Sequence, residues 1–457
     1  MQQAFMIITW GCQMNEDDSQ QMANLLRQMG YRQAMLAEEA DIILLNTCSV
    51  REKPERKVMS KLGELKSLKK IKNNLIIGVC GCMAQRAGNE IVKRAPFVDI
   101  IIGTDQIFEL PQLISKVRAG ERPVFALDLP KRNGNIAFAK PKRVIGDIGL
   151  KHFVPIMYGC NNYCAYCVVP FTRGPERSRP IEDIVAEVQE LTSHGCREVT
   201  LLGQNVNSYG KTQQKSDNLN QLQNDTDSLC DFPTLLGRLN EIEGLWRIRF
   251  TTSHPKDLSD RLIDAMARLP KVCEHLHLPI QAGDNRILHA MNRHYTVEHY
   301  ISLVEKLRNA IPGIAITTDI MVGFPGETEE QFQNTLNAVR RIQFDGAFMF
   351  AFNPRPGTKA AELPNQIDNK TKQRRLLELI NLQNQITLER NEKEVGQEFE
   401  VLVEGPSWKD ESKLTGYTRT NKAVVFPGNP ELSGRLVSIR AIKAHPWGFT
   451  GEIVDAR

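Results

Sequence analysis

Short hydrophobic runs alternate with stretches of helical periodicity along the first 120 residues. The runs are FMIIT (5–9), DIILLN (41–46), LIIGV (75–79) and DIIIG (99–103). The segments between them are amphipathic, and one of them, SQQMANLLRQMG (19–30), stops at a glycine, as helices often do. Continuous aliphatic runs separated by helices are typical of a parallel sheet that helices cover on both faces. The pattern therefore predicts a doubly wound α/β domain over residues 3–120.

A second series of alternating strands and helices begins near Phe153. Its expected strands are FVPIMY (153–158), EVTLLG (198–203), WRIRFT (246–251), HLHLPI (275–280), AITTDIMV (315–322) and GAFMFAF (346–352). Six strand–helix units are two fewer than a complete TIM barrel contains. We therefore predict a partial, open (β/α)6 barrel of the TIM type over residues 146–390.

The remaining segments differ in composition from these two domains. Residues 121–145 mix proline and glycine with basic residues and are expected to be a linker, and the polar segment 211–228 is expected to be a mobile loop. Residues 391–454 carry short apolar runs closely spaced by glycine and proline, which predicts a small five-stranded β-barrel. The fold class is thus α/β, with a flavodoxin-like N-terminal domain, a central barrel and a small C-terminal barrel.

Composition excludes several classes of protein. Of the 457 residues, 41% are hydrophobic and 25% are charged, which is ordinary for globular domains. No apolar run approaches the roughly 18 residues of a membrane span, and no basic segment followed by an apolar one marks a secretory signal. We expect a monomeric cytoplasmic protein without membrane contact. Its cysteines are then expected to stay reduced and to be available as metal ligands.

The net charge of +4 says little by itself, but the positive charge is clustered. Nine Lys and Arg stand against three Glu over residues 50–74, five against none over 131–143, and six against one over 412–443. Such patches can bind phosphates, and the basic C-terminal barrel suggests an RNA-binding module. Solvated helix and loop faces are the alternative, and it stays open for each patch.

The strongest motif is YGCNNYCAYCVVP (158–170), directly after the first expected barrel strand. Cys160, Cys164 and Cys167 can bind three irons of a 4Fe–4S cluster and leave the fourth iron open. A structural zinc site needs four protein ligands, and no nearby Cys or His completes such a set. This CxxxCxxC motif resembles that of the radical S-adenosylmethionine (SAM) superfamily. The resemblance implies that SAM chelates the open iron and is cleaved to a 5′-deoxyadenosyl radical.

Further cysteines follow the first three expected strands of the N-terminal domain. Cys12, Cys48 and the pair Cys80/Cys82 lie at or just after the carboxyl ends of these strands, which share one edge of a parallel sheet. Cys82 follows Gly81 into the loop, whereas Cys80 lies within the strand, so Cys82 is the expected partner of Cys12 and Cys48. We hypothesise that these three hold a second cluster. The cysteines expected to be structural are Cys80, Cys196, Cys230 and Cys273.

Several longer motifs extend the resemblance over essentially the whole chain. They are GCQMNEDDS, NTCSVREKPERK, CGCMAQ, YGCNNYCAYCVVPFTRGPERSR, TSHP, LHLPIQAG and DIMVGFPGET. Together they resemble the methylthiotransferase family, with a C-terminal barrel that resembles a TRAM domain. GCQMN and NTCSVRE resemble the branch that acts on isopentenylated adenosine in tRNA, whereas the ribosomal-protein and threonylcarbamoyl-adenosine branches show GCPKN-like and GCKVN-like motifs. Ala282, where serine is common, and the segment 211–228 depart from the pattern, and neither includes a proposed iron ligand.

The resemblance implies a detailed chemistry. It implies two 4Fe–4S clusters, one at Cys160, Cys164 and Cys167 and an auxiliary one at Cys12, Cys48 and Cys82. One SAM methylates a sulfur at the auxiliary cluster, and a second SAM yields the radical that takes hydrogen from carbon 2 of adenine 37 in tRNA. The carboxyl edge of the N-terminal sheet should therefore face the barrel mouth. The implied partner is the tRNA anticodon stem-loop; the electron donor (flavodoxin-like or equivalent) and the sulfur source are not specified.

Other site residues are assigned less directly. Gly203 and Gln204 follow the second barrel strand and are candidates for SAM contacts, with a tight turn as the alternative. Tyr166 lies between two cluster ligands, where its backbone could meet the adenine or its ring could pack. His254 is expected to cap the SHPKDLS turn as readily as to act as acid or base. No catalytic residue beyond the cluster ligands is assigned.

Three arginines, Arg173, Arg177 and Arg179, follow the cysteine motif closely. They could contact RNA phosphates or SAM, or form ion pairs within the loop, and contact with RNA is favoured. The segment GFPGET (323–328) lacks the spacing of a phosphate-binding loop and predicts a tight turn, with Glu327 starting the next helix.

Two other functions compete with a tRNA methylthiotransferase. One is a methylthiotransferase that modifies a protein side chain, which GCQMN and the basic patches argue against. The other is an RNA-binding protein whose clusters are structural or redox-sensing, which would not cleave SAM. Only the tRNA methylthiotransferase accounts for all three domains and both cysteine triads.

Overall fold

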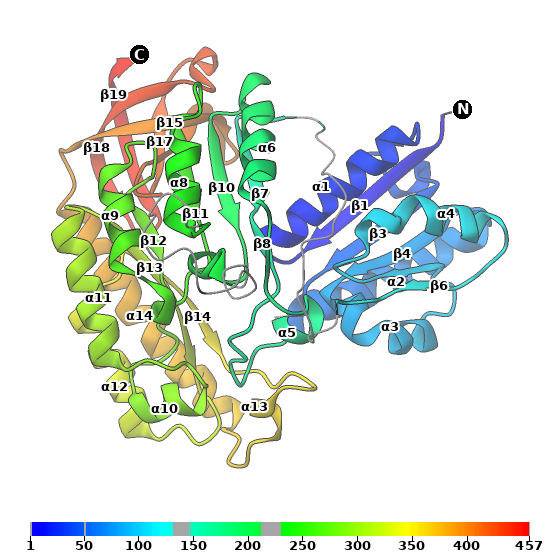
Figure 1. Ribbon diagram of the computed structural model, residues 1–457, viewed down its shortest axis with the longest axis horizontal. Coiled ribbons are helices and arrows are strands. Elements are labelled where there is room, and N and C mark those ends of the chain that lie inside the picture. The colour runs from blue at the N-terminus through cyan, green and yellow to red at the C-terminus, as the bar shows by residue number, and fades with distance from the viewer. Residues whose placement is uncertain (1, 50–51, 131–145, 147, 212–229, 457) are drawn as a thin grey trace, which may run out of the picture.

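The chain folds into an N-terminal α/β domain, a central open barrel and a C-terminal barrel (Figure 1). The computed structural model describes residues 2–49, 52–130, 146, 148–211 and 230–456. Most of the expected linker, 131–145, and most of the expected mobile loop, 212–228, lie outside these residues. Within the described part of the chain, no helix combines the length and the apolar character needed to cross a membrane.

The N-terminal domain is built on a six-stranded parallel sheet with strand order β2-β1-β3-β4-β5-β6. Its elements are β1 (Ala4–Trp10), α1 (Gln13–Gln28), β2 (Arg32–Gln33), β3 (Ile42–Thr47), α2 (Glu52–Ile71), β4 (Ile76–Gly81), α3 (Cys82–Arg94), β5 (Ile100–Ile102), α4 (Leu110–Arg118) and β6 (Val124–Ala126). Alternate strand residues pack against α1 and α4 on one face and against α2 and α3 on the other. The predicted doubly wound, flavodoxin-like domain is confirmed.

Two strands of this sheet were not expected from the sequence. The two-residue strand β2 is too short to give a periodic pattern. The sixth strand, β6, lies within the expected linker, and Val124 is buried in the same core as α4. The ordered sheet therefore extends beyond residue 120.

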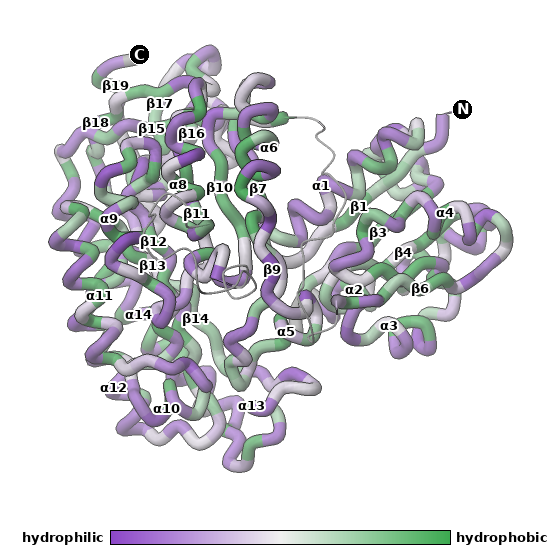
Figure 2. The backbone as a smooth tube through the Cα atoms, viewed as in Figure 1, coloured by the Kyte–Doolittle hydropathy of each residue, from purple (hydrophilic) through white to green (hydrophobic). Residues whose placement is uncertain are grey.

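The central domain is an open barrel of six parallel strands in two sheets, with orders β11-β10-β7 and β12-β13-β14. The strands are β7 (Lys151–Pro155), β10 (Glu198–Leu202), β11 (Arg247–Phe250), β12 (His275–His277), β13 (Ala315–Val322) and β14 (Gly346–Ala351). The helices are α5 (Val169–Thr172), α6 (Ile181–Ser193), α8 (Phe232–Asn240), α9 (Asp260–Arg268), α10 (Asn285–Ala290), α11 (Val297–Ala310), α12 (Glu329–Ile342), α13 (Lys359–Glu362) and α14 (Asn369–Glu392). Hydrophobic residues follow the strands, and hydrophilic ones mark the outer helices (Figure 2). The predicted partial barrel is confirmed.

The first barrel strand is shorter than expected. The apolar run 153–158 is divided at Pro155 into β7 and β8 (Met157–Tyr158). The strand β8 leaves the barrel sheet and pairs antiparallel with β9 (Arg177–Ser178). A continuous apolar run does not reveal this change of partner, because both pieces are buried.

The turn after β13 also differs in detail. The α12 helix begins at Glu329, and its capping residue is Thr328, which forms a capping box with Gln331. Glu327 does not start the helix. Its carboxylate instead accepts hydrogen bonds from the Gly323 amide at 2.6 Å and from Arg375 at 2.8 Å, which fixes the turn from inside.

The C-terminal domain is a closed five-stranded barrel with strand order β15-β16-β17-β19-β18. Its strands are β15 (Glu398–Ser407), β16 (Asp410–Thr418), β17 (Ala423–Pro427), β18 (Leu436–His445) and β19 (Gly448–Ala456). This confirms the predicted small barrel. The long helix α14 contacts both β14 and β18 and so joins it to the central domain.

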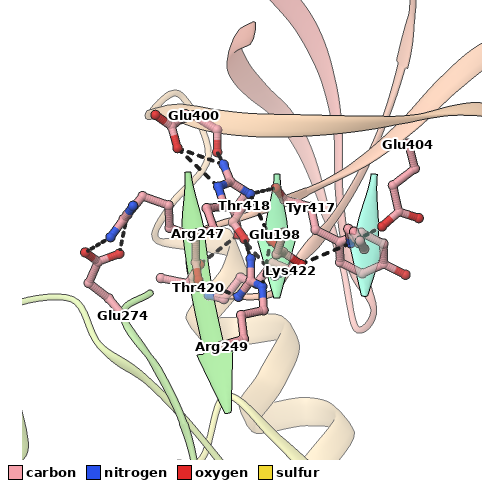
Figure 3. A network of polar contacts seen from close by, with 12 residues as sticks. Glu198, Arg247, Arg249, Glu274, Glu400, Glu404, Tyr417, Thr418, Thr420 and Lys422 are labelled. Carbon is pink, nitrogen blue, oxygen red and sulfur yellow. Dashed lines mark hydrogen bonds and ion pairs between the residues drawn. The ribbon is translucent and has the colours of Figure 1, made fainter. Parts of the chain in front are cut away.

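Buried charges join the C-terminal barrel to the amino ends of the central strands (Figure 3). Arg247, at the start of β11, is fully buried and donates to Glu400 and to the Tyr417 carbonyl, both at 2.8 Å. Arg249 donates to the Thr418 carbonyl at 2.7 Å and lies 3.0 Å from Glu198. The C-terminal barrel therefore closes the end of the central barrel that lies opposite the carboxyl ends of its strands.

Replacing Arg247 with methionine is expected to lower the free energy of unfolding by about 3 kcal/mol, because it leaves the carbonyls of Tyr417 and Glu400 without their donor and removes a cation beside the buried carboxylate of Glu198. Thermal melting should show an earlier transition, and limited proteolysis should release the C-terminal barrel. Arg440→Met is the matched control, because its pair with Glu398 is exposed and such pairs contribute little. Equal melting of both variants would contradict the role given to Arg247.

Candidate functional site

The cysteine motif of the central domain forms a tight loop between β8 and α5. Gly159 begins the loop at φ +77°, and a Cβ on it would lie 2.0 Å from the Pro175 carbonyl oxygen. Only glycine fits this close approach. The amide of Cys160 donates to the Gly174 carbonyl at 3.2 Å, so the start of the loop is bound to the segment that follows α5.

A second segment holds the loop from the opposite side. Asn292 donates its side-chain amide to the carbonyls of Asn162 at 3.2 Å and Tyr163 at 2.9 Å. The next residue, Arg293, is 4% exposed and donates from Nη1 to the Cys164 sulfur at 3.3 Å. Arg293 was not identified from the sequence, because it stands 129 residues after Cys164 in a segment without a motif.

The thiols of this loop lie in a poorly solvated place. Burial raises the pKa of Cys160 to about 11 and also raises that of Cys167, while the charge of Arg293 opposes both shifts. Iron binds thiolates, so loading a cluster here must release protons. The positive charge of Arg293 favours the thiolates that such a cluster needs.

The structure also brings Cys12, Cys48 and Cys82 together. Cys12 caps the start of α1 after β1, Cys48 follows β3, and Cys82 starts α3 after β4. Hydrogen bonds from Cys48, supported by the charge of Arg173, lower the pKa of Cys12 to about 6 and that of Cys82 to about 7. Their hydrogen bonding raises the pKa of Cys48. These thiols are therefore predisposed to become metal ligands.

The other cysteines lie elsewhere. Cys80 is fully buried in β4 within the core that faces α1 and α4, and burial raises its pKa. Cys196 and Cys273 are also buried, and Cys230 is exposed. The choice of Cys82 over Cys80 as the partner of Cys12 and Cys48 agrees with this geometry.

Neither triad resembles a site for a single ion. Among the described residues, no three or more His, Cys, Asp and Glu side chains are grouped to hold one metal ion. An iron–sulfur cluster is wider, because each thiolate binds a different iron. Two sets of three cysteines without carboxylate or imidazole ligands therefore suit clusters better than lone ions.

Polar atoms without partners mark the mouth of the central barrel. Within the described residues, four buried side-chain atoms beyond β10 and β11 have no hydrogen-bond partner: Gln204 Oε1, Asn205 Oδ1, Ser253 Oγ and His254 Nε2. Buried polar atoms are nearly always hydrogen-bonded in native proteins. A polar ligand beside the cysteine loop would satisfy them, and the many polar groups of SAM fit this requirement.

The remaining predicted site residues have visible packing roles. A Cβ on Gly203 would lie 2.5 Å from Met157 Cγ, so glycine lets β10 pack under the cysteine loop. The Tyr166 ring packs against the barrel core, and burial raises its pKa. His254 accepts a hydrogen bond from the Lys256 amide at 3.2 Å, which confirms the expected capping role.

The favoured role for the three arginines after the motif is wrong. Arg173, Arg177 and Arg179 are all 4% exposed and cannot contact RNA phosphates in this structure. They pair with Asp18 at 2.8 Å, Asp105 at 2.9 Å and Glu187 at 2.5 Å, respectively. A run of basic residues in a sequence does not show which of them have buried acidic partners far along the chain.

Two of these pairs join the N-terminal domain to the central one. Asp18 lies on α1 and Asp105 follows β5, and nearby the Thr104 hydroxyl donates to the Thr172 carbonyl at 2.5 Å. The carboxyl edge of the N-terminal sheet therefore faces the mouth of the barrel, as predicted.

A cavity of about 800 Å³ lies inside the central barrel. Its wall takes residues from all six strands, and its ends reach Gln13, beside Cys12, and Trp447 of the C-terminal barrel. Burial lowers the pKa of His275 in this wall to about 3, so its imidazole is neutral at physiological pH. The volume is typical of sites for small ligands or single nucleosides.

Comparison with known proteins agrees with this architecture. Residues 4–103 match the uncharacterised protein family UPF0004, residues 154–339 match the radical SAM superfamily, and residues 392–454 match the TRAM domain. Two relatives are both named tRNA-2-methylthio-N(6)-dimethylallyladenosine synthase. The relative from Moorella thermoacetica is 51% identical over 99% of this chain and 98% of its own length. The relative from Carboxydothermus hydrogenoformans is 48% identical over 99% of this chain and 100% of its own length. The chain belongs to this synthase family.

A more distant solved structure shares the fold of this chain. It is the radical SAM methyltransferase TsrM from Kitasatospora setae, with cobalamin and a [4Fe–4S] cluster bound. The TM-score is 0.52 at 13% identity, over 79% of this chain and 74% of that one. At this identity the likeness supports the fold alone.

One buried acidic residue of the site, Glu176, was not identified from the sequence. Glu176 is 7% exposed and follows the cysteine loop, and its backbone N–H donates a hydrogen bond to Asn161 Oδ1 at 3.2 Å. Burial raises the pKa of its carboxyl to about 7, and a hydrogen bond from Ser208 partly offsets this. Nothing in the motif indicates that this glutamate is buried.

The raised pKa of Glu176 predicts that the stability of the protein depends on pH. The folded protein holds its proton up to about pH 7, whereas the unfolded chain loses it near the ordinary value of 4.5. Stability therefore falls as pH rises through this window, by about 3 kcal/mol in total. Glu176→Gln should remove this loss, so the variant should be the more stable protein at pH 8, as measured by urea unfolding.

The control for this prediction is Glu182→Gln, whose carboxylate is 73% exposed in its pair with Arg238. It should leave the pH dependence of unfolding unchanged. A Glu176→Gln variant that loses as much stability as the native protein between pH 5 and pH 8 would show that Glu176 is not the group responsible.

Proposed function

We propose that this protein is a tRNA methylthiotransferase, which adds a methylthio group to carbon 2 of N(6)-isopentenyladenosine beside the anticodon. The observation with most weight is the convergence of two cysteine triads on one domain boundary. Full-length relatives at 51% and 48% identity carry the matching synthase name. A methylthiotransferase for a protein side chain receives no comparable support.

The two triads are proposed to hold two 4Fe–4S clusters, one at Cys160, Cys164 and Cys167 and one at Cys12, Cys48 and Cys82. When bound, the first supplies the electron that cleaves SAM to methionine and a 5′-deoxyadenosyl radical. A radical is needed because the hydrogen on carbon 2 of adenine is not acidic enough for any side-chain base to remove. Arg293 donates a hydrogen bond from Nη1 to the Cys164 sulfur at 3.3 Å and so fixes the position of this ligand.

The SAM site is proposed at the barrel mouth, beside the cysteine loop. The unpartnered polar atoms of Gln204, Asn205, Ser253 and His254 support it. Gly203 supports the site indirectly, by allowing β10 to approach Met157. The adenine is proposed to enter the barrel cavity from the side of Gln13, next to Cys12.

The substrate class, tRNA, is supported by exposed aromatic and basic groups on the C-terminal barrel. Trp408 is 86% exposed with the Lys409 ammonium 5.0 Å from its ring centroid. Trp447 is half exposed and stacks on His445 with centroids 4.6 Å apart. Exposed rings with nearby cations are suited to stacking on single-stranded bases and to binding phosphates.

The test is anaerobic turnover of reconstituted protein with SAM, a chemical reductant and an isopentenylated anticodon stem-loop RNA. Nucleoside mass analysis should show the methylthio product, together with 5′-deoxyadenosine. The same RNA with unmodified adenosine is the matched control. Product on a ribosomal protein instead of RNA, or SAM cleavage without any methylthio product, would contradict the proposal; absence of SAM cleavage would favour a structural or redox-sensing role for the clusters.

A further inference from the structure

A buried arginine of the central domain lies beside the cysteine triad of the N-terminal domain. Arg173 stands six residues after Cys167, at the end of α5. Its Nη2 donates to Asp18 Oδ2 across the domain boundary at 2.8 Å. Asp18 lies on α1, the helix that Cys12 caps. Arg173 therefore belongs to the central domain by sequence and to the surroundings of the auxiliary triad by contact.

The second terminal nitrogen of Arg173 is unused. Nη1 is buried and has no hydrogen-bond partner among the described residues. An unpaired buried donor of a charged group is costly, so native proteins rarely keep one without a ligand that accepts from it. The sulfurs of Cys12 and Cys82 lie close enough to feel the charge of Arg173, and Cys12 directly precedes α1, the helix that carries Asp18.

A neighbouring arginine shows that an ion pair between the two domains can form without leaving a terminal nitrogen unpaired. Arg177 crosses the same boundary and places both terminal nitrogens on Asp105, at 3.3 and 2.9 Å. Arg173 instead uses one terminal nitrogen on Asp18. A residue that only joined the two domains would gain more from a bidentate pair.

We propose that Arg173 is a positioning residue for the group held by Cys12, Cys48 and Cys82, to which its Nη1 donates a hydrogen bond at a sulfur atom. The proposal rests on the proposed function, in which these cysteines hold a 4Fe–4S cluster. Hydrogen bonds to the sulfurs and nearby positive charge both raise the reduction potential of such clusters. Arg173 thus sets the potential of the auxiliary cluster and ties it to the loop that cleaves SAM.

The test isolates the auxiliary cluster. In the full chain, Cys160, Cys164 and Cys167 are replaced with alanine, the protein is reconstituted anaerobically, and iron content and midpoint potential are measured by redox titration followed by electron paramagnetic resonance. Arg173→Met should keep the iron and shift the midpoint to a more negative potential. Asp18→Asn, which leaves the arginine charge uncompensated, should shift it to a more positive one.

Arg177→Met is the matched control, because it weakens the same boundary without touching the charge beside Cys12 and Cys82, and its midpoint should equal that of the parent. Opposite shifts for Arg173→Met and Asp18→Asn support the proposal, since a general loosening would move both the same way. If Arg173→Met loses its iron, the sign of the Asp18→Asn shift decides. If the midpoint potentials of Arg173→Met and Asp18→Asn are unchanged, or shift in the same direction, the role of Arg173 is overturned while the cluster assignment stands. If the parent protein binds no iron at Cys12, Cys48 and Cys82, the cluster assignment itself is overturned.

Discussion

Protein in which Cys160, Cys164 and Cys167 are replaced with alanine is expected to produce no 5′-deoxyadenosine from SAM. The three thiols occupy one tight loop after β8, at the end of the barrel where the unpartnered polar atoms of Gln204, Asn205, Ser253 and His254 lie. Iron content of the reconstituted protein should fall by about half, because one of the two proposed clusters would be lost. Chromatography of the SAM products and an iron assay measure both effects.

The control for this variant is Cys230→Ala, because Cys230 is exposed and far from both triads in sequence. It should keep full iron content and full SAM cleavage. Continued formation of 5′-deoxyadenosine by the triple variant would mean that SAM is cleaved elsewhere and would remove the basis for a radical mechanism at this loop.

Replacement of Cys12, Cys48 and Cys82 with alanine is expected to separate the two chemical activities. SAM cleavage should continue, because the loop after β8 is intact, while methylthiolated RNA should fall below detection. The reason is geometric: these cysteines lie at the edge of the N-terminal sheet, on a different domain from the loop after β8, and the charge of Arg173 reaches two of them across the domain boundary. Parallel assays of 5′-deoxyadenosine and of the modified nucleoside measure the separation.

Cys80→Ala is the matched control for the second triad, since Cys80 stands two residues before Cys82 but is buried in the sheet core. It should cost about 1 kcal/mol of stability through lost packing and leave the methylthio product intact. Loss of product in Cys80→Ala, with retention in Cys82→Ala, would exchange the roles of these two residues.

The strands that carry the cysteines were predictable because each is a continuous apolar run in a sheet buried on both faces. Cys12, Cys48 and Cys82 could be grouped from sequence because carboxyl ends of parallel strands share an edge, whatever the distance along the chain. The same reasoning failed for β8, since its apolar residues suit a barrel strand and a short antiparallel pair equally. The apolar character of a segment predicts that it is buried, but not which strand it pairs with.

The charged residues of the site were the least predictable part. Arg173, Arg177 and Arg179 resembled an RNA-binding cluster, but the acids that neutralise them come from α1, the segment after β5 and α6. Arg293 and Glu176 act through burial and through a sulfur contact, which depend on how whole elements pack. Local sequence specifies the type of a side chain, whereas its electrostatic role depends on distant neighbours.

The docking of the C-terminal barrel has a consequence for how this enzyme controls a reactive intermediate. Because Tyr417, Lys422 and Trp447 help to line the central cavity, the C-terminal barrel is also a wall of the cavity that we propose receives the adenine. A chain without the C-terminal barrel would lose an RNA-binding surface and would also leave the cavity open at the amino ends of the strands. Water would then reach the cavity from that end. Trp447 belongs both to the exposed aromatic surface proposed to bind RNA and to the cavity wall, so a substitution there would change both.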